Sequence, residues 1–194
     1  MKAGDKAYFE DKEFVNEDFT LKSFIKGEYE NCVFKDCDFN KADLFGVVFL
    51  DVKFINCDLS LANFATTAFR NISFTACKLL GLQFTHGNDF LFEVNFKNCN
   101  LSLSSFYQKK MRKTIFDDCL LSEVDFTECD LSEAKFINCD LTGAKFEQTI
   151  LEKADFSTAY NFAIDPEINQ MKKAKFSSFG LPGLLVKYGL EIKD

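Results

Sequence analysis

The sequence has few of the residues and segments on which many enzymes, secreted proteins and membrane proteins depend. It contains no tryptophan, two prolines and a single histidine, and no apolar run reaches 18 residues. A membrane-spanning helix needs about 20 apolar residues, and the first residues, MKAGDKAYFEDKEF, lack the apolar stretch of a secretory signal. We therefore expect a soluble cytoplasmic protein whose eight cysteines are reduced thiols rather than a disulfide framework.

The chain also lacks the motifs and the charge surplus of several functional classes. Neither the phosphate-binding patterns GxGxxG and GxxxxGK nor the zinc pattern HExxH occurs. A catalytic triad could use only His86, which has no identifiable partner and is expected in an exposed loop. The net charge of −7 argues against direct nucleic-acid binding, since phosphate contacts need surplus lysine and arginine. We predict no enzyme activity, no cofactor and no metal site.

Phenylalanine, in contrast, is abundant and forms part of a five-residue repeat. Large apolar residues occupy every fifth position from Phe9 to Phe84, and the series resumes from Leu91 to Phe156. This period fits neither an α-helix, at about 3.6, nor a strand, at about 2. From residue 32 onward, the position two before each large residue is usually small, and it holds all eight cysteines. The pattern predicts a four-sided coil of about twenty residues, with hydrogen bonds between successive coils.

Like residues recur at intervals of twenty, with a single step of 22. The similar stretches FINCDLSLANF (54–64) and FINCDLTGAKF (136–146) begin 82 residues apart, which is four coils plus two residues. The extra two residues fall in THGNDFLF (85–92), a predicted insertion on one face. The cysteine column could suggest metal or redox chemistry, but reactive cysteines need accessible, electropositive surroundings. Ala, Val and Thr share this position, so we interpret the thiols as buried packing residues.

The repeat units resemble those of a known family. CDLSL, CDLSE, CDLTG, ANFAT and ADFST fit the pattern A(D/N)LXX of the pentapeptide-repeat family, and the resemblance covers roughly residues 7–160. It implies a mainly β fold, a right-handed quadrilateral β-helix.

The two ends of the chain are expected to close the coil. Polar residues at the small inward position (Lys12, Glu17, Lys22) predict an irregular N-terminal cap within a β-helix of residues 1–178, which includes a loop near 160–172. Pro182 and Gly189 predict the start and end of a short helix in residues 179–194. This segment resembles the C-terminal helix and tail of Qnr-type quinolone-resistance proteins. The resemblance implies a capping role and a homodimer through Leu184, Leu185, Tyr188, Leu190 and Ile192.

The charge distribution suggests where a partner binds. Residues 117–160 carry 11 acidic and 3 basic residues, whereas 85–116 carry 2 acidic and 5 basic ones, including KKMRK at 109–113. The Qnr resemblance implies a DNA mimic that binds DNA gyrase or topoisomerase IV and protects against fluoroquinolones. The alternatives are a scaffold for a non-topoisomerase partner and simple solvation of the repeat exterior. Two surfaces are candidates: the insertion residues His86, Gly87, Asn88 and Asp89, and the acidic residues Asp117, Asp118, Glu123, Asp125, Glu128, Asp130 and Glu133.

Overall fold

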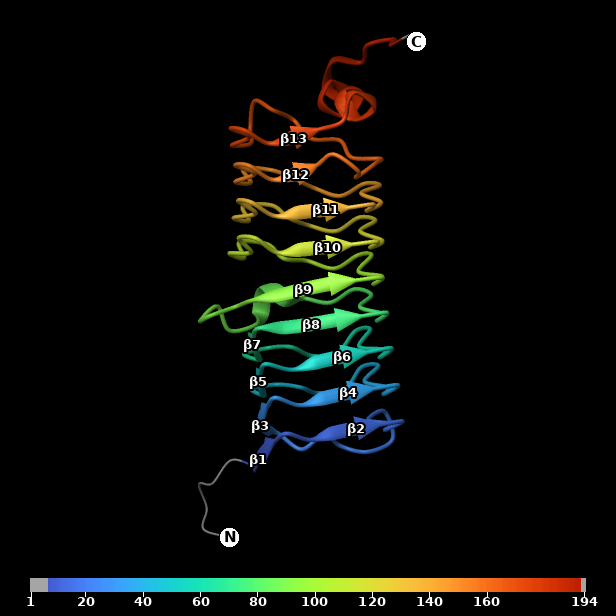
Figure 1. The fold of residues 1–194 in the computed structure, drawn as a ribbon, viewed down its shortest axis with the longest axis vertical. Helices are drawn as coiled ribbons and strands as arrows, with labels where there is room; N and C mark the ends of the chain where they lie inside the picture. Colours follow the sequence, from blue (N-terminus) through green and yellow to red (C-terminus); the bar gives the residue numbers. More distant parts are fainter. Residues whose placement is uncertain (1–6, 193–194) are drawn as a thin grey trace.

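The protein is an elongated coil in which short parallel strands stack along the long axis (Figure 1). This computed structural model describes residues 7–192. Face 1 is a four-stranded sheet made of β1 (Ala7–Glu10), β3 (Gly27–Glu30), β5 (Val48–Leu50) and β7 (Ala68–Arg70). Face 2 is a nine-stranded sheet made of β2 (Glu13–Val15), β4 (Val33–Lys35), β6 (Lys53–Ile55), β8 (Ile72–Thr75), β9 (Val94–Lys97), β10 (Ile115–Asp117), β11 (Lys135–Ile137), β12 (Asp155–Phe156) and β13 (Lys175–Phe176).

The other two sides of the coil consist of single-residue parallel bridges. Face 3 runs from the Asp18–Asp38 bridge to the Asp140–Tyr160 bridge. Face 4 includes the bridges that join Ser105 to Asp125 and Asp125 to Lys145. Partners on adjacent coils are twenty residues apart, as in the pairing of Phe34 with Phe54. The predicted right-handed quadrilateral β-helix is therefore confirmed.

The corners of the coil are built from residues that tolerate a left-handed backbone. At most corners, the residue two positions after the large inward one has a φ between 50° and 71°. Asparagine, aspartate and glycine adopt this conformation at least cost, and along face 2 the corner residues are mostly Asn or Asp. The corner side chains also connect the coils, since Asn56 Nδ2 donates to Asp36 Oδ1 at 2.6 Å.

The Asp or Asn before each large residue has a separate structural role. Asp58 Oδ1 accepts a hydrogen bond from the Ser60 N–H at 2.9 Å, and Asp140 Oδ1 accepts one from the Thr142 N–H at 3.1 Å. This local bond satisfies an N–H group at the start of each turn. The turn therefore explains why Asp or Asn recurs in the second position of the repeat unit.

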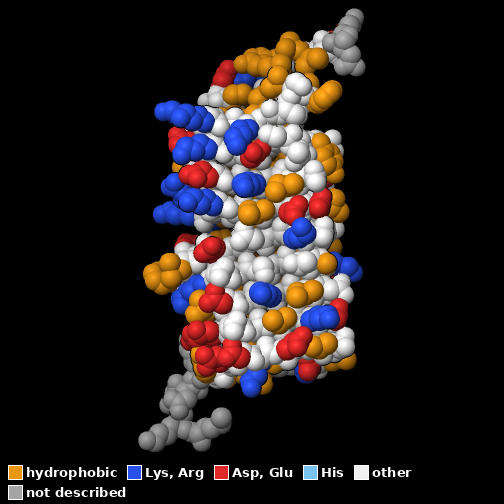
Figure 2. Space-filling view, in the orientation of Figure 1, with side chains coloured by type: hydrophobic (Ala, Val, Ile, Leu, Met, Phe, Trp, Pro, Cys, Tyr) orange, Lys and Arg blue, Asp and Glu red, His pale blue; other side chains and the backbone are white. Residues whose placement is uncertain are grey.

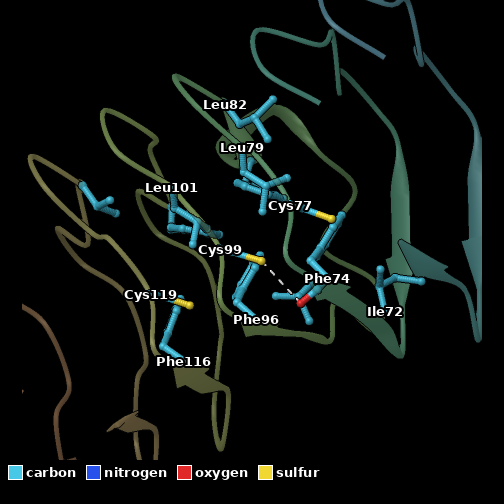
Figure 3. Packing of buried hydrophobic residues seen from close by; sticks show 14 of the residues in the cluster. Ile72, Phe74, Cys77, Leu79, Leu82, Phe96, Cys99, Leu101, Phe116 and Cys119 are labelled. Atoms are coloured by element: carbon cyan, nitrogen blue, oxygen red, sulfur yellow. Dashed lines mark hydrogen bonds between the residues drawn. The ribbon is translucent and has the colours of Figure 1, made fainter. Parts of the chain in front are cut away.

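The core is a set of columns in which like side chains stack. On face 2, Phe rings from Phe34 to Phe176 stack at centroid distances of 4.6–5.3 Å and interplanar angles of 1–12°. The adjacent cysteine column is also buried, as Figure 3 shows for Cys77, Cys99 and Cys119. The Cys99 thiol donates to the Phe74 carbonyl at 3.4 Å. Stacked rings and small thiols thus fill the cross-section of each coil.

The frame shift lies where the sequence predicted it, but its inward residue differs. The step of 22 is confirmed by the pairing of Phe74 with Phe96. Leu91, expected to point inward, is 64% exposed, and Phe92 packs against the core instead. The Phe92 ring lies 6.3 Å from both Phe69 and Phe84. The prediction for Leu91 was wrong because a strict five-residue count cannot locate the inserted residues within the segment.

The ends differ in part from the predictions. The C-terminal helical segment begins at Ser178 rather than at Pro182. It consists of two 3₁₀ helices, η2 (Ser178–Leu184) and η3 (Val186–Tyr188). A further 3₁₀ helix, η1 (Phe84–His86), lies within the coil. Pro182 therefore lies inside η2. Gly189 ends η3 in the left-handed conformation, at φ 57°, as expected. Residues 161–169 contain turns but no strand, and Phe162, Ile164 and Asn169 within them are buried. No helix in the described part of the chain is both long and apolar enough to span a membrane.

Candidate functional site

Three of the acidic residues singled out in the sequence lie close together. Asp125 is in the middle of face 4, and Glu123 and Glu128 occupy the corners on either side of it. Glu147 extends this group on the next coil, since the Glu128 N–H donates to the Glu147 carbonyl at 2.8 Å. The side chains of Glu123, Glu128 and Glu147 are exposed. We call Glu123, Asp125, Glu128 and Glu147 the acidic face.

The other four acidic residues lie elsewhere, and three of them lie beside basic side chains. Asp117 and Asp118 are at the end of β10 on face 2, where Lys97 Nζ lies 2.7 Å from Asp117. Asp130 and Glu133 belong to face 1, with Arg112 at 3.7 Å from Asp130 and Lys153 at 3.6 Å from Glu133. These residues share no single surface with the acidic face. Sequence spacing alone did not reveal this, because successive acids belong to different sides of the coil.

Some of these carboxylates already serve the turns. Asp125 Oδ1 accepts from the Thr127 N–H at 2.9 Å, and Asp130 Oδ1 accepts from the Ser132 N–H at 3.0 Å. Burial alone would raise the pKa of the Asp140 carboxyl. The same kind of turn bond from Thr142, together with a hydrogen bond from Asn161, outweighs burial and lowers this pKa. Glutamates at corners make no such turn bond, but the Glu128 carboxylate accepts hydrogen bonds from the Tyr107 hydroxyl at 3.1 Å and from Gln108 Nε2 at 2.8 Å. Glu123 is therefore the corner member most available to a partner.

The four insertion residues have different positions. His86 is exposed at the end of η1, and Asn88 continues face 1 by bridging Ala68. The Gly87 carbonyl and the Asp89 carboxylate both contact the ammonium of Lys109. The segment that leaves the regular coil follows them, and its tip consists of Phe90 and Leu91, which are 63% and 64% exposed.

Lys109 is an unusual residue for the interior of this coil. It occupies the small inward position that holds Cys129 and Thr149 in the next two coils, and only 2% of its side chain is exposed. Its Nζ donates to the Gly87 carbonyl at 2.8 Å, contacts the Asp89 carboxylate and lies 5.2 Å from the Phe92 ring centroid. A buried ammonium needs such partners. Lys109 therefore fastens the insertion to the next coil.

Sequence reasoning missed the apolar tip and Lys109. The five-residue count places Leu91 in the interior and so hides the tip. For Lys109, the available signal is a lysine at a position otherwise filled by small residues. Figure 2 shows an apolar knob projecting from one edge at the level of the insertion, with basic side chains gathered above it. Lys110, Arg112 and Lys113 line the groove between this knob and the next coil.

The C-terminal segment covers the last coil and leaves an apolar outer surface (Figure 2). Leu184 packs against the core, whereas Leu185, Tyr188, Leu190 and Ile192 are 37–58% exposed. Polar contacts hold the segment down: Lys187 Nζ lies 2.7 Å from Asp165, and the Tyr188 hydroxyl donates to Glu167 at 2.7 Å. The residues expected to form a dimer thus include four that are available for contact and one that docks the segment.

The cysteines pack in the interior of the coil. All eight are buried free thiols. Burial raises the pKa of Cys32, and it raises the pKa of Cys129 to about 12. Within residues 7–192, no group of three or more His, Cys, Asp or Glu side chains is placed to hold a metal ion.

A four-sided solenoid whose interior is stacked side chains and whose exterior carries the charge belongs to the class of solenoid repeat proteins. A family model described as "Pentapeptide repeat region" matches residues 90–159, and a second one, described as "Pentapeptide repeats (8 copies)", matches residues 30–60. The chain belongs to the pentapeptide-repeat family. A comparison of the sequence with curated proteins gave no match.

Solved structures share the fold at low sequence identity. QnrB1, described as a plasmid-mediated fluoroquinolone resistance protein, is similar with a TM-score of 0.60 and 19% identity, over 97% of this chain and 92% of QnrB1. HetL, a pentapeptide repeat protein involved in heterocyst differentiation regulation in the cyanobacterium Nostoc, has a TM-score of 0.41 and 15% identity, over 89% of this chain and 90% of HetL.

Proposed function

We propose that the protein is a non-enzymatic DNA mimic that binds a type II topoisomerase, DNA gyrase or topoisomerase IV, through its acidic face. The observation that carries the proposal is the grouping of Glu123, Asp125, Glu128 and Glu147 on adjacent coils of one side. Carboxylates repeated along a narrow rod present a field that a basic DNA-binding groove attracts.

The charge density of this part of the rod is comparable to that of DNA. Residues 117–160 correspond to roughly 2.2 coils, or roughly 11 Å of axis at about 4.8 Å per coil. With 11 acidic and 3 basic residues, their net charge is −8. Duplex DNA carries one charge per ~1.7 Å, or about 6 charges over the same length. A groove that binds duplex DNA electrostatically would therefore meet a comparable total charge.

The choice of a topoisomerase as the first partner to test follows from the fold shared with QnrB1, a fluoroquinolone resistance protein. The decisive assay is supercoiling by gyrase, and decatenation by topoisomerase IV, with micromolar protein at low salt, with and without a fluoroquinolone. We expect inhibition or drug protection by the wild-type protein. Neither effect in either enzyme would contradict the proposal.

The role of the acidic face is tested by neutralisation with a matched control. The variant E123Q/E128Q/E147Q removes three exposed charges from the acidic face. The control E10Q/E13Q/E28Q removes two exposed charges and one half-buried charge from the N-terminal coils. We expect the first to lose the effect on the topoisomerase and the second to retain it. Equal losses would assign the effect to net charge alone.

A scaffold for a non-topoisomerase partner is the second candidate, and one observation favours it. The Asp residues that precede the large inward residues, such as Asp58 and Asp140, serve the turns, so part of the acidity follows from the fold. Recovery of a single non-topoisomerase protein from native extract, lost in the E123Q/E128Q/E147Q variant, would support this role.

We also propose a homodimer through the C-terminal segment, formed by Leu185, Leu190 and neighbouring exposed apolar residues. Deletion of residues 181–194 is expected to give a monomer by sedimentation. A truncated chain that still sediments as a dimer would contradict this interface.

A further inference from the structure

The groove above the insertion interrupts the hydrogen-bond ladder of face 1. Below it, Asn88 pairs with Ala68, and above it Lys110 pairs only with Asp130. In the next coil, the Asp130 N–H donates to the Lys109 carbonyl at 3.0 Å and the Asp130 carbonyl accepts from the Met111 N–H at 2.7 Å. Among residues 7–192, the N–H and C=O of Lys110 have no hydrogen-bond partners. This coil therefore has an open main-chain edge at Lys110, where one N–H and one C=O are unpaired.

The walls of the groove combine charge with apolar surface. Its volume is about 370 Å³, and its upper wall carries Lys110, Arg112 and Lys113. Glu93 is the one acidic residue that lines it. The lower wall includes Leu91, beside the exposed ring of Phe90, which stacks with the Arg70 guanidinium at 5.2 Å. An occupant must therefore bring negative charge, main-chain hydrogen-bonding groups and an apolar side chain.

The insertion is held in place before any partner arrives. The buried Lys109 ammonium bonds the Gly87 carbonyl and Asp89, and Phe92 packs between Phe69 and Phe84. A wall fixed in this way avoids the entropy cost of ordering a loop on binding.

We propose that this groove binds an extended, acidic segment of a partner protein, which pairs with the main chain of Lys110 and places an apolar side chain against Phe90 and Leu91. Strand addition to an open sheet edge gives affinity through main-chain hydrogen bonds and specificity through side chains. Charge complementarity favours an acidic segment, and the apolar tip together with Glu93 favours a peptide over the denser charge of a nucleic acid. The surface is separate from the acidic face, so this proposal stands apart from the proposed function.

The test uses the full chain and a defined probe, a fluorescent peptide of alternating glutamate and leucine, with a lysine–leucine peptide for comparison. Binding is measured by fluorescence anisotropy. We expect K110E/K113E to weaken binding of the acidic peptide by about tenfold or more. The matched variant K172E/K173E reverses two exposed charges outside the groove and is expected to change affinity by about twofold or less. F90S is expected to weaken binding, whereas F179S, at a 95% exposed residue outside the groove, is not.

Several results would overturn the proposal. These are no binding at about 1 mM peptide, equal losses in the two lysine variants, equal losses in F90S and F179S, or tighter binding of the lysine–leucine peptide. Tighter binding of a short DNA or RNA duplex that K110E/K113E abolishes would assign the groove to nucleic acid. A self-association that K110E/K113E abolishes would assign it to a second copy of the chain. Melting curves of all variants confirm that each is folded.

Discussion

Replacement of the buried Lys109 by methionine tests how the insertion is held in the coil. K109M keeps the length of the side chain and removes its ammonium. The change deletes a charge-assisted hydrogen bond to the Gly87 carbonyl, at 2.8 Å, and a cation–π contact with Phe92, at 5.2 Å. It also leaves the Gly87 carbonyl without this donor. The thioether gains from burial, because methionine has no charge to desolvate.

The net cost follows from these opposing effects. A hydrogen bond to a charged group contributes about 1.5–3 kcal/mol, and a desolvated cation–π contact adds about 1 kcal/mol. Burial of the apolar replacement offsets about half of this sum. We expect K109M to lower the free energy of unfolding by about 2 kcal/mol. The ion pair with Asp89 contributes little, because its carboxylate side chain is 82% exposed.

Amide hydrogen exchange measures this effect where it is expected. A loss of about 2 kcal/mol speeds exchange of the Asn88 amide, which is bonded to the Thr67 carbonyl, by about 30-fold. The control variant D89N is expected to change exchange by about twofold or less. Exchange in K109M that equals the wild type would refute the anchoring role of the ammonium. An equal effect of D89N would show that the exposed ion pair carries it.

Three further predictions follow from the core and the C-terminal segment. F116L breaks two ring stacks and is expected to lower the free energy of unfolding, measured by chemical denaturation, by about 2–3 kcal/mol. F176L breaks one stack at the half-buried end of the column and is expected to lower it by about 1 kcal/mol. Equal losses would contradict the stacking account. The thiols, such as Cys129 with its pKa of about 12, are expected to resist alkylation at pH 8 until the protein is denatured; reaction in the native state would contradict their burial. The hydrogen bond from Lys187 lowers the pKa of Asp165. Its stabilising contribution is therefore present near neutral pH and lost as the pH falls below about 4, the ordinary pKa of aspartate. Faster amide exchange of residues 178–190 at low pH checks this, and K187Q should abolish the pH dependence.

The period of the sequence was sufficient to predict the coil. Inward positions recur every five residues, and stacking at twenty follows because neighbouring coils must share a cross-section. For this reason the pairing of Phe74 with Phe96 across the insertion could be predicted from two columns alone. The start of the C-terminal helical segment could not, since its packing on the last coil, rather than the position of Pro182, determines where it begins.

The surfaces were harder to predict than the core. Asp117 and Glu128 are 11 residues apart in sequence, yet they lie on different sides of the coil, because each side takes only five residues. Within the insertion, Leu91 and Phe92 are both apolar, and only the packing of Phe92 between Phe69 and Phe84 decides which one points inward. The groove depends on that choice and could not be derived from periodicity.

Competition with DNA tests the central claim most directly. A short fluorescent duplex is bound to gyrase or topoisomerase IV at low salt, and the protein is added at increasing concentration. A DNA mimic is expected to displace the duplex, with E10Q/E13Q/E28Q as effective as the wild type and E123Q/E128Q/E147Q at least about tenfold weaker. A duplex that remains bound to both enzymes at saturating wild-type protein would contradict the account.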